Sequence, residues 1–166
     1  MSEPLVALVV PDVRFRASFL AAQQELAADA KIVDDAAFAA MLVDIAAART
    51  RDVTPTRVPS TTLWLVEGDA FIGRISIRHV LSDSLRLLGG HIGYDVRPSR
   101  RGQGYGRRML ALALPHAKAL GVDPAMLTCD AANAASWKMI ERAGGTRVET
   151  FVHDGVARYR YSLPTA

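Results

Sequence analysis

The sequence predicts a mixed α/β domain built around one sheet, and three observations support this fold class. The chain has 166 residues, which suits one domain and is short for two. Short runs rich in Val, Ile and Leu alternate with segments of helical periodicity, and turn residues separate them. The predicted order is strand, two helices, three strands, helix, strand, helix and two strands. We therefore expect residues 1–166 to form a single domain.

The N-terminal half contains the first strand, two helices and a hairpin. Residues 4–10, PLVALVV, form a run of Leu and Val between prolines and predict a strand. Residues 13–29 and 34–50 each repeat apolar side chains at helical spacing, and an aspartate, Asp34 or Asp35, caps the second helix. Residues 61–80 predict two strands joined by a tight turn at 67–69.

The middle of the chain is predicted to hold a connection, a strand and a long helix. Residues 81–90 predict a polar connection, and residues 90–96, GHIGYDV, predict a strand. Residues 104–121 predict a helix that ends at a glycine. Pro115 lies inside this helix, where it removes one backbone hydrogen bond and crowds a carbonyl. We therefore expect a kink or a break at that residue.

The C-terminal part is predicted to be a strand, a helix and a closing hairpin. Residues 125–130, AMLTCD, predict a short strand. The helix of residues 133–145 has Asn133 or Asp130 as its cap and a glycine past its end. Residues 146–163 predict the hairpin, which turns at Asp-Gly, residues 154–155.

Composition and charge exclude several classes of protein. A formal net charge of +3 suits an anionic small ligand as well as it suits nucleic acid. The single cysteine excludes an intramolecular disulfide framework and favours a reducing, cytoplasmic location. No segment reads as a signal peptide or a membrane span. The four histidines are scattered without metal-binding spacing, so we expect no metal.

Residues 91–110 read HIGYDVRPSRRGQGYGRRML and pass from a strand into a helix through Gly102, Gly104 and Gly106. Closely spaced glycines let the backbone approach a ligand without side-chain interference. The free N–H groups and the dipole at a helix start favour an anion. The arginines around the loop are Arg100, Arg101, Arg107 and Arg108. This segment predicts a phosphate or pyrophosphate site.

Three common nucleotide-binding motifs do not match this loop. A dinucleotide fingerprint G-x-G-x-x-G would need a glycine at Arg107. A P-loop needs a lysine after its last glycine, and none follows here. The glycine loop of protein kinases lies between two strands, whereas this one opens a helix.

Residues 101–106, RGQGYG, read as [Q/R]-x-x-G-x-[G/A] between a strand and a helix. This segment resembles the acyl-CoA-binding loop of the Gcn5-related N-acetyltransferases (GNAT), and the wider string GGHIGYDVRPSRRGQGYG looks like a bacterial subgroup of predicted acetyltransferases. The resemblance implies a central, mostly antiparallel sheet of about seven strands flanked by about four helices. It implies acetyl-CoA as co-substrate. The cofactor-binding residues that it implies are Asp95, Val96, Arg101, Gly102, Gln103, Gly104, Tyr105, Gly106, Asn133 and Ser136.

The second signature of that family matches in part. An asparagine opens the next helix, a small residue follows three positions on, and a tyrosine often follows at the seventh. Asn133 and Ser136 match, but Ile140 stands where the tyrosine would supply a proton to the leaving thiolate. Tyr94, Tyr105 and Cys129 are the polar candidates to replace it. Backbone N–H groups around Tyr94 to Val96 are expected to stabilise the developing oxyanion, because the N–H groups of this strand often do so in family members.

His91 is the candidate general base. Family members often carry a glutamate five residues before the valine that ends the strand, and His91 holds that position here. The ordinary pKa of histidine lies near neutrality, which suits the role. A structural histidine bonded to a neighbouring strand is the alternative interpretation. Glu67 and His79, each at a strand end, are further candidates.

The resemblance implies transfer of an acetyl group from acetyl-CoA to a primary amine of a small molecule or peptide. A non-catalytic module of the same fold, which binds acyl-CoA as a sensor or scaffold, is the alternative, and Ile140 keeps it open. A nucleic-acid-binding protein would bind any polyanion with steep salt dependence, and one arginine cluster is weak support for it. We expect no nucleic acid and no membrane as partners, and a homodimer is possible because dimers are common in the superfamily.

Overall fold

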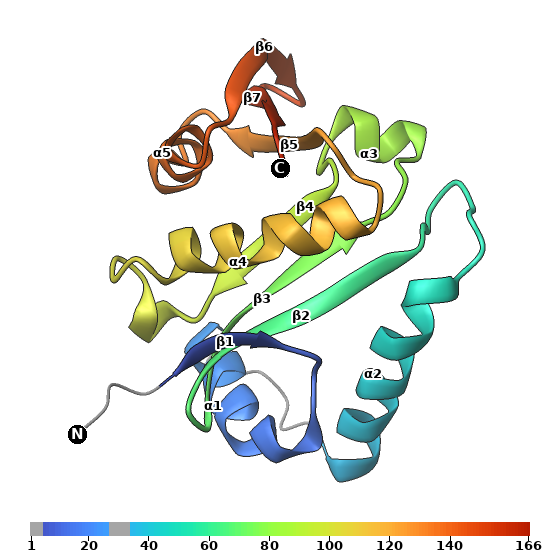
Figure 1. The fold of residues 1–166 in the computed structure, drawn as a ribbon, viewed down its shortest axis with the longest axis vertical. Coiled ribbons are helices and arrows are strands. Elements are labelled where there is room, and N and C mark those ends of the chain that lie inside the picture. The colour runs from blue at the N-terminus through green and yellow to red at the C-terminus, as the bar shows by residue number, and fades with distance from the viewer. Residues whose placement is uncertain (1–4, 27–33) are drawn as a thin grey trace.

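A computed structural model describes residues 5–26 and 34–166, and seven strands of this part form two antiparallel sheets (Figure 1). The strands are β1 (Val6–Val9), β2 (Ser60–Glu67), β3 (Ala70–Arg78), β4 (Ile92–Val96), β5 (Ala125–Asp130), β6 (Thr146–His153) and β7 (Val156–Leu163). The α-helices are α1 (Arg16–Leu26), α2 (Asp35–Ala47), α3 (Asp83–Leu87), α4 (Tyr105–Ala119) and α5 (Ala134–Arg142). Short 3-10 turns are η1 (Val13–Phe15), η2 (Ala48–Thr50) and η3 (Pro98–Arg100).

The two sheets meet between β4 and β5. The larger sheet has the order β1-β2-β3-β4, and the smaller one has the order β5-β7-β6. Among the described strands, β4 is paired only with β3, and a single isolated bridge between Gly90 and Leu127 joins the two sheets. Beyond that bridge β4 and β5 are not hydrogen-bonded to each other as a ladder, which leaves a gap between the sheets.

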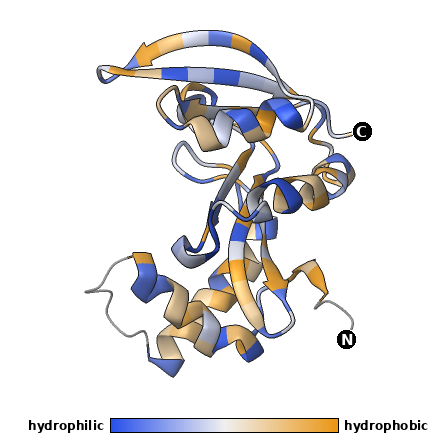
Figure 2. Cartoon of the chain, turned by 90° about the vertical axis from the view of Figure 1, so that its left-hand side faces the viewer, coloured by the Kyte–Doolittle hydropathy of each residue, from blue (hydrophilic) through white to orange (hydrophobic). Residues whose placement is uncertain are grey.

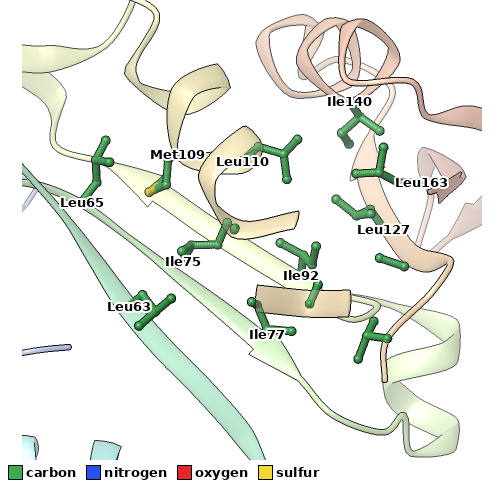
Figure 3. Close-up of a cluster of buried hydrophobic side chains, with 14 of the residues drawn as sticks. Leu63, Leu65, Ile75, Ile77, Ile92, Met109, Leu110, Leu127, Ile140 and Leu163 are labelled. Atoms are coloured by element: carbon green, nitrogen blue, oxygen red, sulfur yellow. The ribbon is translucent and has the colours of Figure 1, made fainter. Parts of the chain in front are cut away.

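Apolar side chains form one core on each face of the larger sheet. The main core lies between that sheet, α4, α5 and the smaller sheet; Figure 3 shows Ile75 and Ile77 of β3 with Met109 and Leu110 of α4. The second core packs α1 and α2 against the opposite face, where Phe19 stacks on Trp64 with ring centroids 4.8 Å apart. Figure 2 shows the β6–β7 hairpin arching at the far end of the molecule from α1 and α2.

The mixed α/β class, the seven strands and the order of the predicted elements are confirmed. The caps resolve to Asp34, which accepts from Ala37 N at 2.7 Å, and Asn133, which accepts from Ser136 N at 3.1 Å. The hairpin turns at residues 154–155, both with positive φ, as the Asp-Gly pair predicts. The predicted first helix extends to residue 29, and its last three residues lie outside the described residues.

Three expectations need correction. The single sheet is two sheets, because β5 pairs with β7 rather than forming a ladder with β4. Residues 81–90 are not only a connection: they contain α3, which Ser82 caps by accepting from Leu85 N at 3.4 Å. The helix does not break at Pro115, since α4 runs through it. Pro115 and Ala111 are exposed, so water can bond the carbonyl that the proline leaves without a donor.

No helix of the described ranges is long and apolar enough to cross a membrane.

Candidate active site

The glycine loop and the start of α4 form a cradle with open space above it. Gly102 has φ +73° and Gly104 has φ +83°, a left-handed conformation that side chains other than glycine rarely adopt. A Cβ built on either residue would meet no atom within 4 Å, so a side chain there would project into the space that a ligand could use. Gly104 caps α4 without a side-chain hydrogen bond, which leaves the first N–H groups of the helix for an anion.

Gly106 serves a different purpose in the same loop. A Cβ at this residue would lie 3.1 Å from the sulfur of Met139 and 3.8 Å from Val96 Cγ2. The missing side chain therefore lets α4 approach α5 and the end of β4 closely. The three glycines of the motif thus divide into two that shape the cradle and one that fixes the packing beside it.

A cavity of about 670 Å³, the first cavity, opens over this cradle. Every residue predicted to bind the cofactor lines it except Gln103, whose side chain instead donates to the carbonyl of Ser99 at 3.0 Å. Arg100 and Arg107 also line it. The residues of this cavity that sequence reasoning missed are Ala135, Lys138, Met139 and Arg142. Their spacing of three to four residues on α5 is the signal that could have found them.

The lining of the first cavity is strongly cationic. Its positive residues are Arg100, Arg101, Arg107, Lys138 and Arg142. Its carboxylate, Asp95, is paired with Arg74 at 2.7 Å on the edge of the sheet. Glycine amides, a helix start and converging cations fit a ligand with several phosphate groups, which is the chemistry of coenzyme A.

Arg101 and Tyr105 hold the loop in place. Arg101 Nε donates to the carbonyl of Val96 at 2.9 Å, which ties the loop to the end of β4. The Tyr105 hydroxyl donates to Glu67 Oε1 at 2.7 Å, and this bond raises the pKa of the tyrosine. Glu67 also lies 3.4 Å from Arg100 Nη1. Glu67 lines neither cavity described here, so its contacts are those of a loop anchor.

A second cavity of about 360 Å³ lies in the gap between β4 and β5. Tyr94, Asn133 and Ser136 line both cavities, so they mark where the two meet. The other residues of the second cavity are Arg78, Gly89, Ile92, Gly93, Leu127, Thr128, Cys129, Asp130, Ile140 and Arg158. The two cavities are adjacent and are together called the cleft below; the first holds the cationic cradle, and the second has a mixed apolar and charged lining.

The backbone of β4 offers hydrogen-bond donors to this junction. Arg97 N donates to the carbonyl of Ile72 at 2.9 Å, which makes these two residues a hydrogen-bonded pair of the β3–β4 ladder. Such pairs alternate along an antiparallel ladder. Tyr94 and Val96, which face Ile75 and Gly73, therefore direct their N–H groups away from β3 and toward the gap.

Tyr94 is half-buried at the junction, and its hydroxyl shares a hydrogen bond with the Ser136 hydroxyl. Burial raises the pKa of Tyr94, although the bond to Ser136 opposes this. The phenol therefore keeps its proton at neutral pH. It is a hydrogen-bond donor in a position where the two cavities meet.

His91 lines neither cavity. Its ring Nδ1 accepts a hydrogen bond from Met126 N at 2.9 Å, and its backbone N–H donates to the Met126 carbonyl at 2.7 Å. Burial, Arg86 and Arg78 lower the pKa of the imidazole. The accepted bond fixes the neutral tautomer with its proton on Nε2, so Nε2 has no lone pair to take a proton from a substrate. These contacts are those of a structural histidine, and they join the start of β4 to β5.

His79, the other histidine considered as a base, is also engaged away from the cleft. Its Nε2 lies 2.9 Å from the Thr61 hydroxyl, and it lines neither cavity. Burial and the charge of Arg49 lower its pKa.

Ile140 and Cys129 are buried residues that line the second cavity. Ile140 is 1% exposed and lies beside Leu163 and Leu127 (Figure 3), so an apolar side chain completes the core where the family tyrosine would stand. Cys129 is buried, and burial raises the pKa of its thiol. A thiol held protonated is a poor nucleophile. In the described ranges, no three His, Cys, Asp or Glu side chains gather closely enough to hold a metal ion.

The family model for the acetyltransferase (GNAT) domain matches residues 19–146. The chain belongs to the GNAT acetyltransferases. This confirms the family and the acetyltransferase activity predicted from the glycine loop, in an enzyme class that uses acetyl-CoA as co-substrate. A comparison with curated proteins finds no match.

This GNAT protein has the same fold as several acetyltransferases of known structure. The microcin C7 self-immunity acetyltransferase MccE, in complex with acetyl-CoA and AMP, has a TM-score of 0.65 and 15% identity over 99% of this chain and 93% of that one. RimL, a ribosomal L7/L12 alpha-N-protein acetyltransferase in complex with coenzyme A, has a TM-score of 0.66 and 14% identity over 97% and 96%. An N-acetyltransferase from Staphylococcus aureus Mu50 has a TM-score of 0.65 and 15% identity over 99% and 100%.

Proposed function

We propose that this protein transfers the acetyl group of acetyl-CoA directly to a primary amine. The observation that carries the proposal is the pair of adjacent cavities that share three lining residues. Its first cavity combines glycine amides, a helix start and five cations, and its second cavity opens from the same junction of Tyr94, Asn133 and Ser136. One cavity suits a polyphosphate carrier, and the other leaves room for an acceptor next to it. Neighbours of the same fold were solved with acetyl-CoA or coenzyme A, which supports this cofactor here.

The residues of the first cavity are proposed to bind and orient acetyl-CoA, whose chemistry is that of an activated acetyl thioester. The amides that follow Gly104 and the side chains of Arg101 and Arg107 would hold phosphate groups, which their position in the lining of the first cavity supports. Asn133 and Ser136 at the start of α5 form the wall opposite Tyr94. This arrangement would position a thioester at the junction, where β4 offers N–H groups.

The chemistry at the junction is proposed to rest on β4. The outward N–H groups of Tyr94 and Val96 would donate to the acetyl oxygen as negative charge develops on it. The Tyr94 hydroxyl would donate a hydrogen bond to the departing sulfur, in place of the tyrosine that Ile140 replaces. The proton that the sulfur takes up is balanced by the one that the amine loses on acylation. Burial raises the pKa of the Cys129 thiol, which disfavours an acyl-cysteine intermediate and supports direct transfer.

No titratable side chain in the cleft has the contacts of a dedicated base, so we propose that the amine loses its proton through water. The two carboxylates that line the cleft are both paired with arginine, Asp95 with Arg74 at 2.7 Å and Asp130 with Arg158 at 2.6 Å. An alkyl amine has a pKa of about 10.4, so raising the pH should raise the rate by increasing its neutral fraction.

The alternative of a non-catalytic acyl-CoA-binding module rests on Ile140 alone, whereas the match of the acetyltransferase domain model to residues 19–146 supports an enzyme. Calorimetry with acetyl-CoA, coenzyme A and ATP would test the cofactor, and release of free thiol from acetyl-CoA on addition of amines would test turnover. We expect acetyl-CoA and coenzyme A to bind in preference to ATP, and thiol to be released with an amine present. Binding without release for any amine would support the module. Absence of binding would remove both candidates.

The single-domain organisation, the cytoplasmic location and the homodimer stay predictions.

A further inference from the structure

Arg78 is a charged side chain in the second cavity that the proposed chemistry does not use. It ends β3, is half-buried, and lines the cavity together with Gly93 and Tyr94 of β4. Burial lowers its pKa, but a guanidinium stays protonated at neutral pH. A positive charge is therefore held permanently at the wall of the cavity that an acceptor would enter.

Two glycines make room for this guanidinium. A Cβ on Gly93 would lie 3.5 Å from Arg78 Nη2, and a Cβ on Gly89 would lie 3.6 Å from Nη1. The guanidinium thus lies against backbone from two segments, where side chains would confine it further. Its Nη1 donates to the carbonyl of Gly90 at 2.8 Å, which fixes its orientation. Guanidinium carries five N–H donors, so this one bond leaves most of them for a ligand.

The charges of the second cavity do not cancel. Its charged residues are Arg78, Arg158 and Asp130. Arg158 Nη1 is paired with Asp130 Oδ1 at 2.6 Å, whereas Arg78 has no carboxylate partner in the described part of the chain. One positive charge therefore remains, and it complements one negative charge on a ligand.

Arg78 lies close to the junction at which the amine would react. The guanidinium lies against Gly93, which directly precedes Tyr94, and Tyr94 lies where the two cavities meet. An anionic group bound to Arg78 would belong to a molecule whose amine reaches the junction within a short distance. A polyamine would bring a second positive charge toward Arg78 instead, which is unfavourable.

We infer that the acceptor is an amine that also carries a carboxylate, as a free amino acid does, and that Arg78 binds this carboxylate. The inference rests on the proposed function and names its substrate class. The fork of the guanidinium matches the two oxygens of a carboxylate. A carboxylate site favours a free amino acid over the N-terminus of a protein, because the α-carboxyl group of an N-terminal residue is part of a peptide bond.

The experiment compares matched acceptors on the whole chain at saturating acetyl-CoA, with release of free thiol as the readout. One mixture contains the standard L-amino acids without cysteine, and a second contains the corresponding α-carboxamides. Phosphoethanolamine and spermidine are tested separately. We expect the amino acids to react at least about tenfold faster than the amides, the size that loss of a charge-assisted hydrogen bond gives. Spermidine should react no faster than the amides.

The variant Arg78→Gln should lower kcat/KM for the amino acids at least about tenfold and leave the affinity for acetyl-CoA unchanged. Arg86→Gln is the matched control, since it removes the same charge from an exposed residue of α3 that lines neither cavity. Its kcat/KM should stay within about twofold of wild type, below the effect of one hydrogen bond. Should Arg78→Gln not fold, Arg78→Lys keeps the charge without the fork and should retain part of the preference.

Each contrary result has its own meaning. Equal rates for amino acids and amides, or a preference for spermidine, would overturn the carboxylate and leave the acetyltransferase standing. Reaction with phosphoethanolamine alone would show that the bound anion is a phosphate and would overturn the inference as well. Bound acetyl-CoA without thiol release in any mixture would overturn the proposed turnover itself, and the inference with it.

Discussion

The cradle of the first cavity comes from one short segment, residues 101–106, and β4 and α5 complete its walls. The second cavity has no such segment and is assembled from residues on β3, β4, β5, α5 and β7. The first uses backbone amides and positive φ angles at Gly102 and Gly104, which local sequence dictates. The second depends on which strands lie beside one another. The comparison teaches that this protein specifies its carrier locally and its acceptor through tertiary structure, so changes in the two cavities should have separable effects.

The largest effect should come from Gly104→Val, which tests the local half of the comparison. A side chain at φ +83° is strained and would project into the cradle, so we expect affinity for acetyl-CoA to fall more than about 100-fold by calorimetry. Gly121→Val is the matched control at the other end of α4, because Gly121 has φ +78° and equally open space. Both variants carry backbone strain of about 1–3 kcal/mol, but only the first should lose acetyl-CoA. Equal loss in both would mean that strain, not the cradle, controls binding.

A smaller effect should come from Tyr94→Phe, which tests the junction of the two cavities. Removing the hydroxyl that contacts Ser136 should lower kcat about 10- to 100-fold and leave the affinity for acetyl-CoA within about twofold. Tyr159→Phe serves as the control, because Tyr159 packs on Trp137 and Arg147 and lines neither cavity. An undiminished kcat in Tyr94→Phe would assign the departing sulfur to water.

The same contrast explains what the sequence could predict. The strands, the long helices and the glycine loop follow from periodicity, caps and glycine spacing, which act within a few residues. The helix α3 was missed because its five residues are too few to show a period, and only the cap at Ser82 marks it. The split into two sheets was missed because it depends on β5 pairing with β7, a choice between strands that pattern alone does not make.

The site follows this rule as well. Gly102 and Gly104 were predicted, because conformation and helix start are visible in six residues. Arg78 was not predicted, because nothing near it in the chain shows that Gly89 and Gly93 would enclose its guanidinium. Lys138 and Arg142 were missed although their helical spacing was visible, since which face of α5 meets the loop is a tertiary property.

The smallest effect should come from His91→Asn. This variant tests whether His91 acts as the general base or only joins β4 to β5. In His91→Asn the amide oxygen can accept from Met126 N in place of Nδ1. We expect the pH–rate profile to keep its shape, because the imidazole has no free lone pair toward the cleft. We expect a loss of up to about 1 kcal/mol of stability at neutral pH, or 2–4 °C in Tm for a chain of this length.

Acid titration of stability sharpens the same test. Burial, Arg86 and Arg78 lower the pKa of His91 in the folded state, so below the ordinary value near 6.5 the unfolded chain binds a proton that the folded chain refuses. Wild-type Tm should therefore fall as the pH drops from about 7 to 5, and His91→Asn should flatten part of that fall. His79→Asn is the necessary control, since the pKa of His79 is lowered as well. If His91→Asn instead removed a near-neutral step from the rate profile and left the Tm curve unchanged, His91 would be the base, and the acceptor cavity would have to extend to it.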